Sequence, residues 1–252
     1  MEAGDVQIQS LKVKSELNLK IWDRDDGYRM HRDVRTKLLD VTNYFISYCE
    51  INEFKLNPPI RDVILTGSLA NYNWSIYSDL DIHIVMDMDG IDATTTSVLV
   101  AYLELRKKQF AEQHDIRVVS HEVEMYVQDG MVGLVAGGIY SIRQDEWLRF
   151  PKKYDKHIDW DMIKRKAMTY MSAVDEMEKL VDFGSVKSRD ILLKRLRDIW
   201  KKIKSERRAG LKEAGEFAVE NLIFKILRRN GYIEKILKLR SRIISEKLSL
   251  NG

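Results

Sequence analysis

With 252 residues, 44% of them hydrophobic, the chain can form one large domain or two of ordinary size, and we expect two. Its single cysteine, Cys49, excludes an internal disulfide framework, and the five histidines lack the spacing of a zinc finger or zinc protease. A net charge of only +3, no signal-like N-terminus and no apolar run near the ~20 residues of a membrane span predict a soluble, cytoplasmic protein without a membrane partner.

The first periodic stretch of the chain predicts a helix over about residues 29–50. Apolar residues recur there at steps of three and four, which places Val34, Leu38, Val41, Phe45 and Tyr48 on one buried stripe. Two prolines follow this stretch and cannot continue a helix.

Two apolar strands are predicted next, at about residues 62–66 and 79–87. Because side chains alternate along a strand, Asp79, Asp81 and His83 face one way and the apolar residues between them face the other. Paired carboxylates on a strand that is otherwise buried are costly unless a cation neutralises them. A divalent metal ion would serve.

Beyond the second strand, Asp92 is expected to cap a helix that continues to about Gln113. Its apolar spacing predicts that Val98, Tyr102 and Leu105 face inward.

A third strand is predicted over residues 116–127, with alternating faces. His121, Val123 and Met125 share one face, and Glu122 and Glu124 share the other. The segments G-G-I-Y-S-I and E-W-L-R-F then predict two short strands before Pro151.

From about residue 159 onward the pattern is helical only, which predicts a domain boundary and two domains, 1–154 and 155–252. The second is expected to be entirely helical. Its predicted helices cover about 160–181, 187–208, 213–229 and 231–247, with breaks at Gly184-Ser185, Ala209-Gly210 and Asn230-Gly231.

Charge is unevenly divided between the two parts. Residues 151–252 carry 26 Lys and Arg against 15 Asp and Glu, which leaves 16 against 24 for residues 1–150. A basic half suits a polyanion such as RNA, whereas a lysine-rich helical surface that is simply solvated is the alternative. The basic residues crowd one predicted helix: Lys194, Arg195, Arg197, Lys201, Lys202, Lys204, Arg207 and Arg208.

The spacing of Gly67-Ser68, ten intervening residues and then Asp79-x-Asp81 resembles the signature of the DNA polymerase β-type nucleotidyltransferase superfamily. The resemblance covers roughly residues 30–130. It implies an α+β catalytic domain, a small mixed sheet flanked by helices, in which the Gly-Ser element ends a strand and opens a helix that holds a nucleoside triphosphate.

The same resemblance implies the site residues and the cofactor. Two aspartates hold Mg²⁺ or Mn²⁺, and a later strand adds a third acid, for which Glu124 is our first choice and Glu122 the reserve. The expected catalytic and metal set is therefore Asp79, Asp81 and Glu124, with Gly67, Ser68 and Ser78 on the triphosphate.

One stretch departs from the family pattern. Tyr72 and Asn73 stand where many members have a glycine and a small hydroxyl residue. The aromatic residues Tyr72, Trp74 and Tyr77 either stack on a ligand ring or pack beneath the loop.

The expected activity is transfer of a nucleoside monophosphate from a nucleoside triphosphate such as ATP to an acceptor hydroxyl, with release of pyrophosphate. RNA, such as a tRNA end, is the favoured acceptor because of the basic half. The alternatives are a small-molecule or protein hydroxyl, as in antibiotic adenylyltransferases, synthesis of signalling oligonucleotides, and a silent triphosphate-binding module.

Overall fold

The structure, a computed structural model, describes residues 8–49, 58–131, 136–183 and 186–249. It combines α-helices with a mixed β-sheet, as expected, and also contains a two-stranded sheet that was not predicted. Two compact units are present, one over Lys12–Tyr154 and one from Asp155 onward that also takes in the described N-terminal residues up to Leu11. The described residues contain no helix that is both long enough and apolar enough to cross a membrane.

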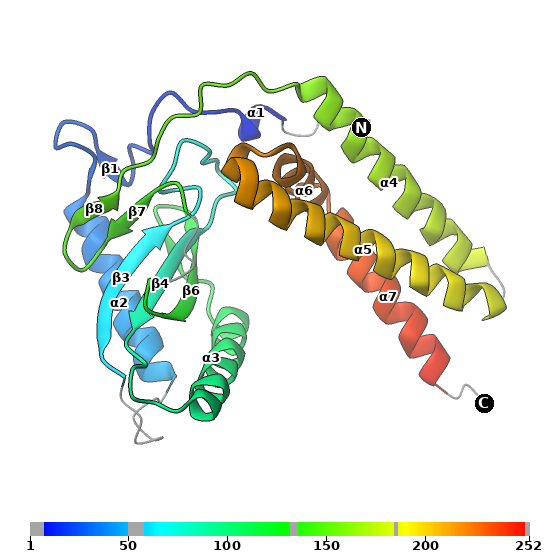
Figure 1. Ribbon diagram of the computed structural model, residues 1–252, viewed down its shortest axis with the longest axis horizontal. Helices are drawn as coiled ribbons and strands as arrows, with labels where there is room; N and C mark the ends of the chain where they lie inside the picture. The colour runs from blue at the N-terminus through cyan, green and yellow to red at the C-terminus, as the bar shows by residue number, and fades with distance from the viewer. Residues whose placement is uncertain (1–7, 50–57, 132–135, 184–185, 250–252) are drawn as a thin grey trace. The chain divides into compact units, whose positions relative to one another are not determined.

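The unit over Lys12–Tyr154 is built on a mixed six-stranded sheet with the order β5-β6-β4-β3-β7-β8 (Figure 1). Only β4 and β6 run parallel; all other neighbours are antiparallel. A separate two-stranded sheet pairs β1 (Trp22–Asp23) with β2 (Arg29–Met30). The six strands are β3 (Ile60–Thr66), β4 (Leu80–Met86), β5 (Arg117–Val118), β6 (His121–Asp129), β7 (Ile139–Ser141) and β8 (Glu146–Arg149).

The buried faces of β4 and β6 share one hydrophobic core with α2 (Arg32–Tyr48) and α3 (Ala93–Gln113). The predicted stripe on α2 is confirmed for Val34, Leu38, Val41 and Phe45, which are buried, whereas Tyr48 is half-buried. With the apolar face of β4 turned toward this core, Asp81 and His83 lie on the opposite face, as strand alternation predicts.

Helix α3 is capped as predicted but buries a different stripe. The Asp92 carboxylate accepts hydrogen bonds from the amides of Thr94 and Thr95. The predicted inward residues Val98 and Leu105 are wrong: they are 63% and 60% exposed. Apolar residues are spread around this helix, and the core takes the stripe formed by Leu99, Leu103 and Phe110.

The predicted third strand is in fact a hairpin. Its first part is β5 and its second is β6, joined by Val119 and Ser120, whose φ angles are +52° and +69°. Nothing in the two residue types marks this turn, since a two-residue hairpin of this kind normally carries Asn-Gly.

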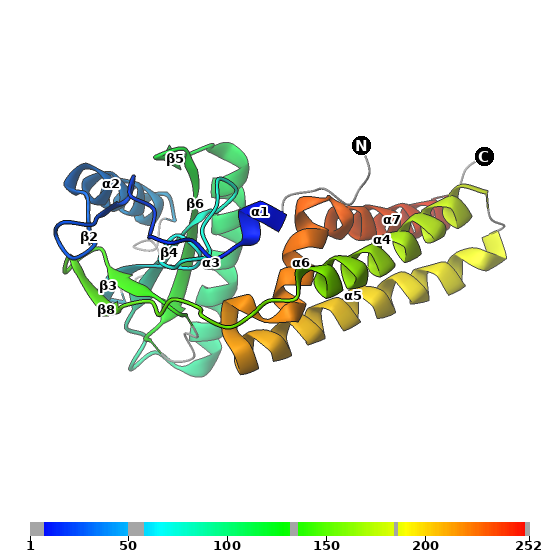
Figure 2. The same ribbon diagram turned by 90° about the horizontal axis from the view of Figure 1, so that it is seen from above.

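The second unit contains α4 (Trp160–Phe183), α5 (Val186–Ala214), α6 (Val219–Arg229) and α7 (Tyr232–Leu248), with a short 3₁₀ turn at Gly215–Phe217. Figures 1 and 2 show α4, α5 and α7 running alongside one another. Within this unit Arg229 donates to the hydroxyl of Ser10, a residue of α1 (Ile8–Leu11).

The predicted helix breaks in this unit have different outcomes. The one at Asn230-Gly231 is confirmed, with Gly231 at φ +75°. The one at Ala209-Gly210 is wrong, since α5 continues through it. A Cβ on Gly210 would lie 2.8 Å from a Glu220 carboxylate oxygen and 3.0 Å from the Ala218 Cβ, so the glycine serves a close packing contact instead of a break. Gly184-Ser185 lies outside the described residues.

Candidate functional site

Gly67 lies directly against the Asp81 carboxylate. Thr66, the last residue of β3, is the strand partner of Asp81, and Gly67 follows with φ +73°. A Cβ on Gly67 would stand 1.9 Å from Asp81 Oδ2. Both the backbone conformation and the space therefore require glycine here.

Hydroxyl groups join the two ends of the loop between β3 and β4. The Ser68 hydroxyl donates to Ser78 Oγ at 2.7 Å, and Ser78 Oγ accepts from the Ser75 amide at 2.9 Å. The Gly-Ser element does not open a helix, contrary to what the resemblance implies: residues 67–70 form a turn. A phosphate at this loop would therefore depend on hydroxyls and turn amides, since no helix N-terminus is present at residues 67–70.

Glu124 is brought next to Asp81, whereas Glu122 is not. In the parallel ladder between β4 and β6, Asp81 is the partner of Glu124. Neighbouring strands are about 4.8 Å apart, so the two carboxylates rise side by side from one face of the sheet. Glu122 is exposed and pairs with Arg117 of β5 instead.

All three acids affect the pKa of Tyr126. Its hydroxyl donates to Glu124 Oε2. Burial, followed by this hydrogen bond and then by the negative charges of Glu124, Asp81 and Asp79, raises the pKa of the phenol. The phenol thus stays protonated, and the three acids lie within electrostatic reach of one hydroxyl group.

Lys107 of α3 supplies a positive charge that the sequence analysis missed. Its Nζ lies 3.3 Å from the centroid of the Tyr126 ring. Burial lowers the pKa of the Lys107 ammonium, and the negative charges of Glu104, Glu124 and Asp81 oppose that change. One lysine of the basic run Arg106-Lys107-Lys108 carries no sequence signal for such a role.

His83 shares the face of Asp81 but is held by its neighbours. Its Nδ1 hydrogen bonds with Gln128 Oε1 at 2.6 Å, and its ring stacks on Tyr126 with 4.8 Å between centroids. Burial is the main cause that lowers the pKa of this imidazole. His83 therefore orients Tyr126, the partner of Glu124.

The three acids suit magnesium in chemistry, since they offer only carboxylate oxygens. In the part of the chain that the structure describes, no three His, Cys, Asp or Glu side chains already stand close enough together to hold a metal ion. Glu124 instead accepts a hydrogen bond from the Tyr126 hydroxyl. A bound metal ion would therefore require these carboxylate side chains to move closer together.

The aromatic residues of the loop fall into separate places. Tyr72 is buried in the core, whereas Tyr77 is exposed. Trp74 is half-buried and donates its Nε1–H to the Glu16 carbonyl oxygen at 2.8 Å. Of the three, Trp74 lines a cavity.

An exposed basic stripe runs along α5 in the helical unit. Its five residues are spaced by three or four positions, so they share one side of the helix. Arg207 is not part of this surface, because its guanidinium lies 4.0 Å from the Phe224 ring centroid and donates to Asn221. The basic stripe consists of Lys194, Arg197, Lys201, Lys204 and Arg208, all exposed.

Comparison of the chain with protein-family models, curated proteins and solved structures returned no match. The function is therefore argued from the residues and contacts described above.

Proposed function

We propose that the chain is a metal-dependent nucleotidyltransferase that moves a nucleoside monophosphate from a nucleoside triphosphate to an acceptor hydroxyl. The observation that carries the proposal is the contact between Gly67 and the Asp81 carboxylate, with Glu124 as the next strand partner. Because Gly67 lacks a side chain, the Asp81 carboxylate lies directly against the turn that would bind phosphate.

Asp79, Asp81 and Glu124 would hold the magnesium ions. When bound, such ions supply stabilisation of the charge on the attacking and departing oxygens. The acceptor oxygen forms its bond to the α-phosphorus, the bond to pyrophosphate breaks, and the acceptor proton leaves to a carboxylate or solvent. Around this step the hydroxyls of Ser68 and Ser78 orient phosphate oxygens, and Lys107 adds positive charge beside the acids.

RNA is the proposed acceptor. The basic stripe on α5 is exposed and its five side chains repeat along one side of the helix, which suits a phosphate backbone. A small-molecule hydroxyl is the alternative acceptor that the following experiment separates from RNA, and label on neither acceptor would favour the silent triphosphate-binding module.

The test incubates the full chain with each labelled nucleoside triphosphate, Mg²⁺ or Mn²⁺, and either total RNA or an RNA-free small-molecule extract. We expect label on RNA, lost in the Asp79→Ala/Asp81→Ala variant and kept in an Asp89→Ala control, whose carboxylate is exposed. Label that appears only in the extract would reassign the acceptor. Equal labelling by the wild-type chain and the double variant would overturn the proposed activity.

A further inference from the structure

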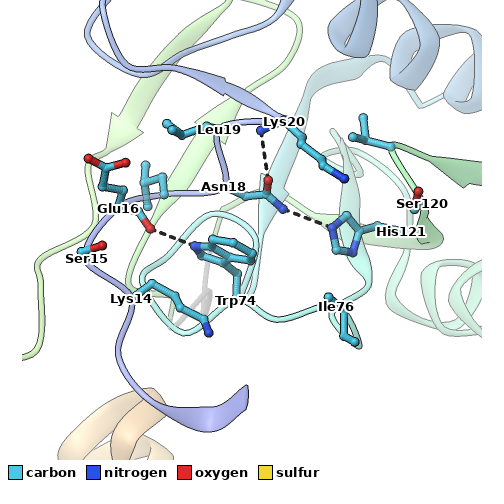
Figure 3. A pocket seen from close by; sticks show the side chains of 12 residues that line it. Lys14, Ser15, Glu16, Asn18, Leu19, Lys20, Trp74, Ile76, Ser120 and His121 are labelled. Carbon is cyan, nitrogen blue, oxygen red and sulfur yellow. Dashed lines mark hydrogen bonds between the residues drawn. The ribbon is translucent and has the colours of Figure 1, made fainter. Parts of the chain in front are cut away.

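A cavity of about 460 Å³ opens in the unit over Lys12–Tyr154, outside the group of acids. It is bounded by residues 14–20, by Trp74 and Ile76, and by residues 119–121 (Figure 3). This volume falls within the ~300–1,000 Å³ typical of small-molecule sites.

The charge of this cavity is positive. Lys14 and Lys20 line it, and neither has a carboxylate within ion-pair distance among the described residues. Glu16, the acid on the same segment, is paired with Arg24 at 2.5 Å. The cavity therefore favours an anion.

Apolar surface lies beside these lysines. Ile76 is 76% exposed and Leu19 is 47% exposed, although both are large hydrophobic residues. The indole of Trp74 is fixed by its hydrogen bond to the Glu16 carbonyl oxygen, and Lys14 Nζ lies 5.4 Å from its centroid. A rigid aromatic ring among exposed aliphatic side chains suits a flat, partly apolar ligand.

The cavity wall is connected to the loop that precedes Asp79. His121 donates its Nδ1–H to the Ser78 carbonyl oxygen at 2.7 Å, and its Nε2 accepts from the Asn18 amide at 3.1 Å. His121 and Glu124 are three residues apart on β6, about 10 Å along the strand, and their side chains lie on opposite faces of the sheet. Because Trp74 and Ile76 belong to the loop between β3 and β4, an occupant of the cavity would contact the loop that leads to Asp79.

The turn at the edge of the cavity contains Val119, a residue that is unfavourable in the backbone conformation found there. Val119 is β-branched and holds φ +52°, a region that such residues rarely adopt. Its side chain lines the cavity and also touches the hydrophobic core. Strain of this kind is typical of positions kept for binding.

We propose that this cavity binds a nucleotide, a planar ring joined to a phosphate, with the ring against Trp74 and Ile76 and the phosphate at Lys14 and Lys20. The source is either a free nucleotide or the terminal nucleotide of an RNA. Binding in the cavity is independent of the nucleotidyltransferase function proposed above. If that function holds, the bound nucleotide would serve as its acceptor, and only this step rests on it.

The binding test is calorimetric titration of the full chain in EDTA, which removes divalent ions from the acids. The probes are each nucleoside monophosphate, the matching nucleoside, inorganic phosphate and a short single-stranded RNA. At least one monophosphate is expected to bind more tightly than its nucleoside and than phosphate. If the RNA binds more tightly than the monophosphate, the ligand is an RNA end. If the monophosphate binds more tightly than the RNA, the ligand is a free nucleotide.

Two charge variants locate the site. Lys20→Glu places a carboxylate beside the phosphate and Ile76→Glu places one beside the ring, both at exposed positions, and each is expected to weaken binding by about tenfold or more. The matched controls Val98→Glu and Lys108→Glu, on exposed positions of α3, are expected to leave the affinity unchanged.

The turn offers a second, independent readout. Val119→Asn with Ser120→Gly installs the favoured turn sequence, so we expect a higher melting temperature together with about tenfold weaker binding. Ser120→Gly alone retains the Val119 side chain, so it is expected to raise the melting temperature with a smaller loss of affinity than the double variant.

The outcomes separate this inference from the proposed function. Nucleotide binding that persists in Asp79→Ala/Asp81→Ala and falls in Ile76→Glu supports the cavity, even if no transfer activity is found. Binding that disappears in the double variant assigns the ligand to the acids and overturns the inference, as does binding unaffected by Ile76→Glu and Lys20→Glu, or no binding of any monophosphate.

Discussion

Gly67 makes the sharpest prediction about a single residue, because Gly90 provides a matched control. Both have positive φ, +73° and +85°, but only at Gly67 would a Cβ meet another group, the Asp81 carboxylate. We expect Gly67→Ala to lower the transfer rate by about 10²-fold by displacing Asp81. The measurement is the initial rate of nucleotide transfer at saturating metal.

Gly90→Ala separates backbone strain from the steric conflict. It carries a similar cost of an L-residue at positive φ, about 1–2 kcal/mol, and no Cβ contact within 4 Å. Its unfolding in urea should shift while its transfer rate stays at the wild-type value. Equal losses of rate in the two variants would argue that the contact with Asp81 has no role.

The sequence was informative about residues on strands and uninformative about residues that reach them from elsewhere. Alternation along β4 and β6 correctly puts Asp81 on the face away from the core and distinguishes it from its apolar neighbours. The choice of Glu124 over Glu122 as the neighbour of Asp81 needed the register of a parallel pair. Lys107 comes from a helix, and its position depends on packing that no local pattern encodes.

At the scale of elements, the packing of α3 on β6 places Lys107 near the acids. Its ammonium interacts with the carboxylates of Asp81 and Glu124, so it would compete with a metal ion bound there. In Lys107→Met we expect Mg²⁺ to raise the melting temperature by more than it does in the wild-type chain. Thermal melts across a magnesium series measure this.

The control for Lys107 is its exposed neighbour on the same helix, Lys108. Lys108→Met removes the same charge from α3 and should leave the magnesium response unchanged. If all three proteins respond alike, then Lys107 does not share its carboxylates with the metal.

A second element-scale prediction concerns the pair of helices α4 and α5. The Tyr170 hydroxyl donates to Glu206 at 2.8 Å, and burial, then this bond and the charge of Glu206, raise the pKa of Tyr170 to about 12. The protonated phenol is favoured in the folded state, so its stabilising effect is complete below pH 10 and is lost as the pH rises to about 12.

NMR of ring-labelled tyrosine, with Tyr170→Phe to assign the signal, should show Tyr170 titrating near pH 12. In Glu206→Gln the hydrogen bond acceptor remains but the charge is lost, so the titration should move toward the ordinary value of 10.0. A Tyr170 signal that titrates near 10 in the wild-type chain would contradict the assigned contact.

The limits of sequence reading at this scale have physical causes. The helix cap at Asp92 was predictable because capping is a local interaction. The hairpin at Val119 was not, since its turn violates the local preference for Asn-Gly. The continuation of α5 through Gly210 was also not predictable. Glycine is needed there because Ala218 and Glu220 leave no room for a side chain, and this contact is not local in sequence.

At the scale of the whole molecule, the charge division is the feature that bears on the acceptor. Lys194, Arg197 and Lys201 of the basic stripe are exposed. If RNA phosphates lie along this stripe, each contact releases counterions, so the binding constant falls steeply with salt. A solvated lysine-rich surface would bind RNA weakly and without regard to which lysines are removed.

The triple variant Lys194→Gln/Arg197→Gln/Lys201→Gln distinguishes these readings. For single-stranded RNA each lost phosphate contact lowers the slope of log K against log salt by about 0.7, so three lost contacts lower it by about 2. Lys12→Gln/Lys37→Gln/Lys108→Gln removes an equal charge from exposed positions of the other unit. Fluorescence anisotropy over a salt series should show the reduced slope only in the first variant. Equal slopes in both variants would indicate that RNA responds to net charge alone, which would remove the basic stripe as the reason for naming RNA as the acceptor.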